Sequence, residues 1–165
     1  MRIENMMSRE VTTCGPRTTL AEAGRLLRSI DSGILPVVLE GRVVGVLTDR
    51  DICIALAEQD RLPSQMTAGE AMSRSVVSCR PEAHVRSALA AMREKRLRRL
   101  PVISAEGRLE GILSVNDVIL HADAEGESTG VSYSDLAHTL QKICEHRYPA
   151  PPPALPDVTA LVRAV

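Results

Sequence analysis

Aromatic residues are almost absent from this chain. Its 165 residues include two tyrosines, no phenylalanine and no tryptophan. The core must therefore be built from Val, Ile, Leu, Met and Ala. Proteins that bind single-stranded nucleic acid usually offer aromatic side chains on which bases stack, so this composition argues against that class.

Long apolar runs and an excess of one charge are lacking as well. No apolar run approaches the roughly 20 residues needed to cross a bilayer, and no apolar segment of a signal peptide follows Met1. The formal net charge is -1, with 25% charged residues, which leaves no basic footprint for duplex nucleic acid. We therefore expect a cytoplasmic protein without nucleic-acid or membrane partners.

The cysteines and histidines predict neither a metal site nor a catalytic centre. His121 and Asp123 have no third ligand in register, and nucleophile-elbow, Walker and His-Glu-x-x-His motifs are missing. We predict no catalytic cofactor and no enzyme, and keep a small enzyme with its own site only as a third hypothesis. None of the cysteines lies in a Cys-x-x-Cys pair; they are Cys14, Cys53, Cys79 and Cys144.

What the chain does have is an internal repeat. Residues 7–38 match residues 72–103 at a constant spacing of 65, and one inserted residue makes the spacing 66 for the later matches. Two copies are too few for a solenoid, but they suit two small domains packed about a pseudo-twofold axis, which produces two related clefts. The shared segments are Met7-Ser8-Arg9 with Met72-Ser73-Arg74, Leu35-Pro36-Val37 with Leu100-Pro101-Val102, and Gly45 to Asp51 with Gly111 to Asp117.

Each copy predicts the order strand, helix, strand, strand, helix. A strand is expected over residues 11–13 and again over 76–78, followed by a helix with apolar residues on one face. A hairpin then turns at Glu40-Gly41 or Glu106-Gly107.

The predicted fold class is α+β, with two β-α-β-β-α domains and a C-terminal extension. The extension contains an apolar stripe at helical spacing and a Pro-rich end. The helix is expected to cover the body of the protein or a partner subunit. The predicted segments are a first domain (3–57), a linker (58–67), a second domain (68–122), a flexible connector (123–131), an amphipathic helix (132–148) and a Pro-rich tail (149–165).

The motif Gly-h-h-[Thr/Ser]-x-x-Asp, where h is apolar, follows the hairpin in both copies. Thr48 and Ser114 stand at helix N-caps, with Asp51 and Asp117 three residues on. One interpretation is a capping box. The other is a ligand site, because a helix N-terminus suits a phosphate and a carboxylate one turn later can accept from ribose hydroxyls. The motif glycines, Gly45 and Gly111, leave room for close approach by either the backbone or a ligand. They therefore do not decide between the two interpretations, and both stay open.

The ordered set of motifs resembles the cystathionine-beta-synthase (CBS) domain, and its tandem occurrence over residues 3–122 resembles a Bateman module. The resemblance implies paired domains with two clefts that bind AMP, ADP, ATP or S-adenosylmethionine. It implies that Asp51 and Asp117 hold the ribose, with Thr48 and Ser114 near the phosphate. It also implies base pockets formed by Thr13, Cys14, Leu35 and Pro36 in one copy and by Ser78, Cys79, Leu100 and Pro101 in the other.

A basic run distinguishes the second copy from the first. Arg98 and Arg99 stand where the first copy has Gly33 and Ile34. A solvated helix end, with cations favoured by the dipole, is one interpretation. The resemblance implies instead that Arg99 faces the ligand phosphate. We predict unequal sites, with Arg99 and Arg98 attracting a polyphosphate.

Two main functional hypotheses follow. The first is a non-catalytic regulatory module that binds an AMP- or ATP-type adenine nucleotide. The second is a structural dimerisation or interaction module with empty sites, in which the Thr/Ser-x-x-Asp motifs act only as caps. A homodimer and a separate protein target are expected partners.

Overall fold

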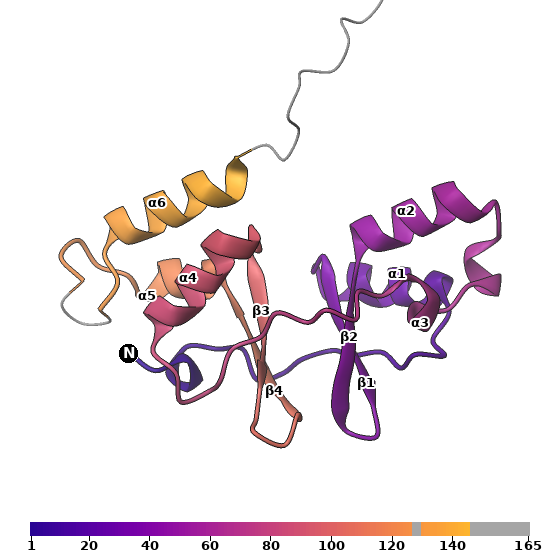
Figure 1. The fold of residues 1–165 in the computed structure, drawn as a ribbon, viewed down its shortest axis with the longest axis horizontal. Coiled ribbons are helices and arrows are strands. Elements are labelled where there is room, and N and C mark those ends of the chain that lie inside the picture. The colour runs from indigo at the N-terminus through magenta and orange to yellow at the C-terminus, as the bar shows by residue number, and fades with distance from the viewer. Residues whose placement is uncertain (127–129, 146–165) are drawn as a thin grey trace, which may run out of the picture.

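Two antiparallel hairpins form the centre of the molecule. The computed structural model describes residues 1–126 and 130–145. One hairpin pairs β1 (Ile34–Leu39) with β2 (Arg42–Thr48), and the other pairs β3 (Arg99–Ile103) with β4 (Leu109–Ser114). The hairpins lie side by side (Figure 1), and a bridge between Arg42 and Arg108 joins them near their turns.

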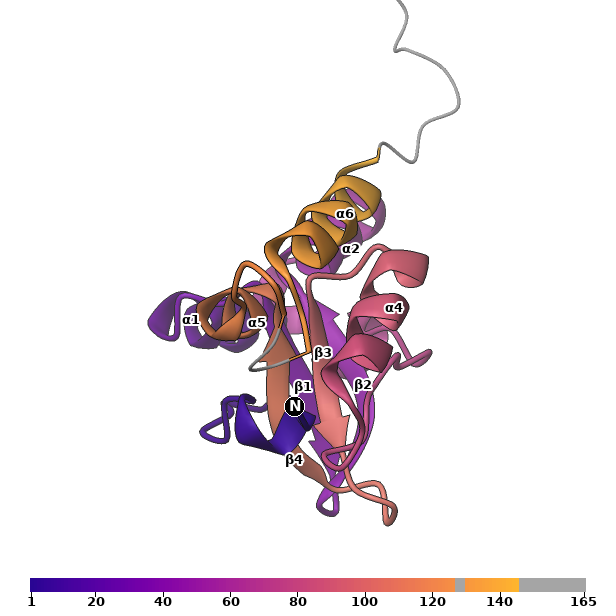
Figure 2. The same ribbon diagram turned by 90° about the vertical axis from the view of Figure 1, so that its left-hand side faces the viewer.

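Helices flank each hairpin. The helices between residues 20 and 71, which include the first short helix of the second copy, gather around β1 and β2, and those between residues 85 and 144 gather around β3 and β4 (Figure 1). Figure 2 shows the molecule after a quarter turn, with β3 and β4 in front of β1 and β2. The mixed helix and strand architecture predicted from the repeat is therefore confirmed. The helical elements are η1 (Ile3–Asn5), α1 (Leu20–Ser29), α2 (Asp49–Gln59), η2 (Pro63–Gln65), α3 (Ala68–Ala71), α4 (Val85–Lys95), α5 (Val115–His121) and α6 (Tyr133–Cys144).

A proline prevents the first expected strand of each copy from forming. Cys14 is the one residue of its segment that bridges β1: its amide donates to the Pro36 carbonyl (3.1 Å), and the Val38 amide donates to the Cys14 carbonyl (2.8 Å). The preceding donor on β1 would be the nitrogen of Pro36, which carries no hydrogen. Pro101 stops the equivalent ladder beside Cys79. Residues 11–13 and 76–78 are therefore not strands.

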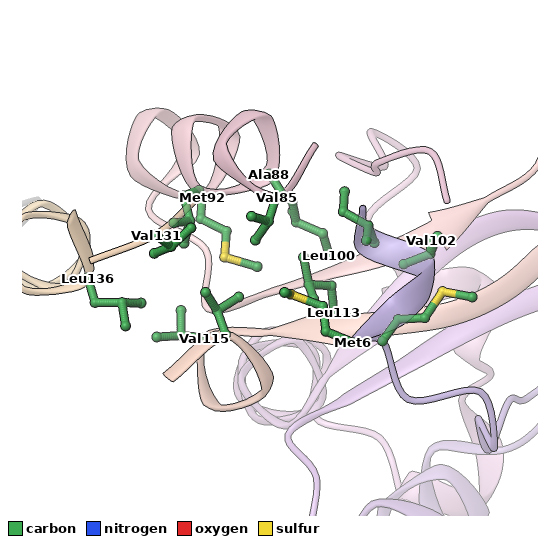
Figure 3. Packing of buried hydrophobic residues seen from close by; sticks show 14 residues of the cluster. Met6, Val85, Ala88, Met92, Leu100, Val102, Leu113, Val115, Val131 and Leu136 are labelled. Atoms are coloured by element: carbon green, nitrogen blue, oxygen red, sulfur yellow. The ribbon is translucent and has the colours of Figure 1, made fainter. Parts of the chain in front are cut away.

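The start of each copy packs on the other copy. Ser8 and Ile112 exchange two backbone hydrogen bonds of 2.9 Å, and Ser73 and Val46 do the same in the equivalent place. Figure 3 shows Met6 with Leu113 and the other core side chains of the second copy. Each hydrophobic core is thus completed by residues at or just before the start of the other repeat: Ile3, Met6 and Met7 enter the core of the second copy, and Met66, Ala68 and Met72 enter that of the first.

The C-terminal helix covers the body of the protein. Ser132 and Asp135 form a capping box at the start of α6, and Leu136 and Thr139 are buried where α6 lies along α4 (Figure 1). Within the preceding connector, Val131 is also fully buried. The predicted helix extended to residue 148; the structure describes it to Cys144, and residues 146–148 and the Pro-rich tail lie outside the described residues.

Candidate ligand clefts between the repeats

Two clefts of unequal size lie between the copies, and each combines residues of both. We name them the large cleft, of about 980 Å³, and the small cleft, of about 250 Å³. Ligand pockets usually span about 300–1,000 Å³, so only the large cleft lies within that range. The large cleft is lined mainly by Ile34, Val46, Thr48, Arg50, Asp51, Ser73, Ser75, Val76, Val77, Arg96, Leu97, Arg98, Arg99, Pro101, Ile143, Cys144 and Glu145. The small cleft is lined by Ser8, Glu10, Val11, Thr12, Ile30, Asp31, Ser32, Ile34, Arg99, Ile112, Ser114 and Asp117.

Thr48 and Asp51 form a complete capping box at the edge of the large cleft. The Asp51 amide donates to Thr48 Oγ1 (3.1 Å), while the Thr48 amide (2.9 Å) and hydroxyl (2.7 Å) both donate to Asp51 Oδ2. Asp51 Oδ1 receives no hydrogen bond from the described residues. The structural interpretation therefore accounts for one carboxylate oxygen and leaves the other available to a ligand.

Ser114 and Asp117 repeat this geometry at the small cleft, with one difference. The Ser114 amide (2.7 Å) and hydroxyl (2.6 Å) donate to Asp117 Oδ2. Here the Ser8 hydroxyl also donates to Asp117 Oδ1, at 3.4 Å. The second aspartate thus has a partner on both oxygens, in a cleft too small for most ligands.

The two clefts differ in charge as well as in size. Four arginines and two carboxylates line the large cleft, whereas one arginine and three carboxylates line the small one. Within the described part of the chain, Arg50, Arg98 and Arg99 form no ion pair. Arginines without a counter-ion favour an anionic ligand in the large cleft.

Arg99 and Ile34, which are repeat equivalents, line both clefts. Arg98, by contrast, lines only the large one. The structure thus brings Arg98 and Arg99 of the second copy to Thr48 and Asp51 of the first. It does not bring Arg98 to the small cleft.

The glycines of the motif make room for the segments that cross to the other copy, Met7-Ser8 and Met72-Ser73, which we call the exchanged segments. A Cβ on Gly45 would lie 3.0 Å from the Ser73 carbonyl oxygen and would also meet Met72. A Cβ on Gly111 would lie 2.8 Å from both the Ser8 carbonyl oxygen and Met7 Sδ. Of the two alternatives that the sequence left open, these contacts match close approach by backbone rather than by a ligand.

Most residues expected at the base pockets lie elsewhere. Of the eight, only Pro101 lines either cleft. Thr13 and Ser78 are exposed outside the clefts, Cys79 is partly buried, and the remaining four are core residues: Cys14, Leu35, Pro36 and Leu100. Burial raises the pKa of the Cys14 and Cys79 thiols to about 11, and the described cysteines are free thiols.

The segments one to two residues earlier line the clefts instead. Val76 and Val77 line the large cleft, and Val11 and Thr12 line the small one. These residues are outside the sheet because Pro36 and Pro101 end the parallel ladders. The proline of each Leu-Pro-Val motif is the sequence signal that could have located them.

Other site types find no support in the described structure. No group of three or more His, Cys, Asp or Glu side chains within residues 1–126 and 130–145 could hold a metal ion. Over the same ranges, no helix has the length and apolar character needed to cross a membrane.

Comparison with known proteins agrees with the duplicated architecture. The sequence model of the CBS domain matches residues 3–58 and again residues 68–123. The chain belongs to the CBS domain family. It is 32% identical to the CBS domain-containing protein YhcV of Bacillus subtilis over 136 residues, which cover 82% of this chain and 95% of YhcV.

Two solved CBS structures with bound ligands are similar to this chain. The complex of CBSX2 with AMP is 28% identical, with a TM-score of 0.65, over 73% of this chain and 94% of CBSX2. The CBS domain pair of protein MJ0100 was solved with 5′-methylthioadenosine and S-adenosyl-L-methionine. It is 25% identical, with a TM-score of 0.66, over 73% of this chain and 94% of the other. Adenosine compounds therefore bind to proteins that share this fold.

Proposed function

We propose that this protein is a non-catalytic regulatory module that binds an adenosine ligand carrying phosphates in its large cleft. The observation that carries the proposal is the meeting of two elements in one cleft. Thr48 and Asp51 come from the first copy, and Arg98 and Arg99 come from the second. The ligands of CBSX2 and of the MJ0100 pair support the choice of an adenosine compound.

Each lining element suits one part of such a ligand. Asp51 Oδ1, which the capping box does not use, is an acceptor for ribose hydroxyls. The arginines offer planar donors that match phosphate oxygens. Ile34, Val76 and Val77 provide an apolar surface for the base, which agrees with the lack of aromatic residues in this chain.

The charge of the large cleft favours AMP, ADP or ATP over S-adenosylmethionine. Four arginines against two carboxylates attract phosphates and disfavour the positive sulfonium group of S-adenosylmethionine. The number of phosphates should raise the affinity, because each added charge meets the same set of arginines. Ligand binding would have a regulatory effect because it favours one arrangement of the two copies, or of two subunits, over another.

A structural module with empty clefts is the second candidate. It is favoured by the capping boxes, which are complete without any ligand, and by exposed apolar side chains on α2 and α5. Ile54 and Leu120, which are repeat equivalents, are 42% and 82% exposed. Such side chains suit an interface between two subunits of a dimer. The homodimer, a separate protein target and a cytoplasmic location stay predictions.

The two motif aspartates provide a matched test. We expect Asp51→Ala to weaken ATP binding more than tenfold in calorimetry, because a ribose hydrogen bond to a charged group contributes about 1.5–3 kcal/mol. Asp117→Ala should leave ATP affinity within about twofold. Both variants lose one capping box, so each should lose about 1 kcal/mol of stability.

Because both aspartate variants should lose the same stability, a difference in their ATP affinity reports on binding and not on folding.

Arg98 provides a second test. Arg98→Ala should weaken the binding of ATP more than that of AMP and leave adenosine binding unchanged, because only the phosphates lose a partner. Equal losses of affinity in the two aspartate variants would contradict an assignment to the large cleft. If wild type binds no nucleotide at millimolar concentration, the structural module is the correct function.

A further inference from the structure

The last turn of α6 forms part of the wall of the large cleft. Buried Leu136 and Thr139 anchor the helix against the second copy, and its end brings Ile143, Cys144 and Glu145 to the cleft. The small cleft, as lined by the described residues, has nothing from this helix. Because α6 follows the repeats and has no repeat equivalent, it gives the large cleft a wall that the small cleft lacks.

Glu145 brings a negative charge to a cleft that is otherwise rich in arginine. Its Oε2 lies 3.5 Å from Arg96 Nη2, and its Oε1 accepts a hydrogen bond from Lys142 Nζ at 2.6 Å. The bond from Lys142 holds the pKa of Glu145 below its usual value, so this side chain is ionised at neutral pH. The C-terminal end of a helix also carries partial negative charge. The end of α6 therefore places one ionised carboxylate among the arginines of the large cleft.

We propose that Glu145 is an internal counter-ion that occupies Arg96 in the empty large cleft, and that a polyphosphate ligand displaces it from Arg96. Glu145 then sets how many phosphates a ligand needs for tight binding. This inference rests on the proposed function, because it concerns the same cleft. It adds α6 to the ligand site and gives a residue outside the repeats control over ligand selection.

The exchange of Glu145 for a phosphate is physically easy. The side chains of Arg96 and Glu145 are 32% and 46% exposed, and ion pairs with that much exposure stabilise proteins only weakly. A phosphate offers Arg96 several oxygens for charge-assisted hydrogen bonds. Glu145 keeps Lys142 as a partner after the exchange, so neither carboxylate nor phosphate is left without a cation.

The test compares Glu145→Gln with wild type by calorimetry, using ATP, AMP and adenosine at one ionic strength. Removing the internal competitor should tighten ATP binding about two- to fivefold, the range expected for a weak exposed pair. The gain should be smaller for AMP and absent for adenosine. Glu94→Gln is the matched control: Glu94 pairs with Lys95 at 2.7 Å but lines neither cleft, so its substitution should change nothing.

A double-mutant cycle assigns the effect to Arg96. In an Arg96→Ala background, Glu145→Gln should no longer tighten ATP binding, because the pair is already broken. ATP should also slow alkylation of Cys144, which lines the cleft, and leave exposed Cys53 unprotected. The inference is overturned if wild type binds ATP but Glu145→Gln binds it equally well, or if ATP leaves Cys144 unprotected. If wild type binds no nucleotide, the proposed function fails first and this inference fails with it.

Discussion

Asp51 and Asp117 show how one contact separates two otherwise equivalent residues. Each aspartate uses Oδ2 to accept two hydrogen bonds from its own helix cap. Ser8 then reaches Oδ1 of Asp117, whereas Ser73, its repeat equivalent, makes no such bond to Asp51 among the described residues. A difference at one hydroxyl thus coincides with the difference in cleft size.

His84 connects the N-terminus of the chain to the N-terminus of α4. Its Nδ1 accepts from the Arg86 amide at 3.2 Å, and its Nε2 lies 3.0 Å from the Met1 nitrogen. Desolvation, followed by the positive charges of the N-terminus and Arg86, lowers the pKa of His84 below 6.5. The folded protein therefore favours the neutral imidazole, while the unfolded chain binds a proton more readily.

This shift predicts that His84 makes a contribution to the stability of the protein that depends on pH. The contribution of His84 is complete above the unfolded pKa of about 6.5 and is lost as the pH falls from there through the folded pKa. Between about pH 7.5 and about pH 5.5, a range that spans this titration, the melting temperature of the tag-free wild type should fall more than that of His84→Asn. Asparagine keeps a capping oxygen but does not titrate, so equal falls in both proteins would contradict the prediction.

At the scale of elements, the packing of each hairpin against the exchanged segment depends on close approach. Gly45 in β2 and Gly111 in β4 lie against the Met-Ser segments, and a Cβ on either glycine would stand within 3.0 Å of a backbone oxygen. Gly24, inside α1, has open space around the same position. The two kinds of glycine should therefore respond in opposite ways to substitution by alanine.

We expect Gly45→Ala to lower the free energy of unfolding by about 1–3 kcal/mol. The Ser73 carbonyl is part of the backbone that is hydrogen-bonded to Val46, so it cannot move away without disturbing those bonds. Gly24→Ala should raise the free energy of unfolding by about 0.5–1 kcal/mol, since alanine restricts the unfolded chain and favours helix. Urea denaturation followed by circular dichroism measures both. Destabilisation by both variants to a similar extent would show that the contact with Ser73 is not the cause.

At the scale of the whole molecule, the exchanged segments make two repeats into one folding unit. The core of the first copy contains Met66 and Met72, and the core of the second contains Ile3 and Met7. Each repeat therefore lacks part of its own core when it is separated from the other. Burial of such side chains contributes about 2–5 kcal/mol each relative to alanine, which is comparable with the total stability of a small domain.

Fragments 1–60 and 61–165 should consequently remain unfolded when each is alone. Mixing them should restore helical circular dichroism and dispersed amide resonances, because each fragment supplies the missing core segment of the other. The intact chain is the control and should unfold in a single transition. A folded fragment 1–60 in isolation would contradict this prediction.

The sequence by itself determined the features that depend on neighbouring residues. The hairpins follow from local apolar segments and Gly turns, and the Thr48–Asp51 and Ser114–Asp117 caps follow from a spacing of three residues. The asymmetry of charge was also visible in Arg98 and Arg99, which the structure places at the large cleft.

The tertiary structure alone decided which distant segments meet. Repeat spacing does not reveal that Met7 and Met72 cross to the opposite cores, because either packing buries the same apolar side chains. Pro36 and Pro101 limit each parallel ladder to one residue. Residues 76–77 and 11–12 therefore lie outside the sheets and line the clefts. The arrival of Glu145 at Arg96 depends on how α6 packs along α4. Contacts of this kind are set by burial over the whole chain, which no local pattern encodes.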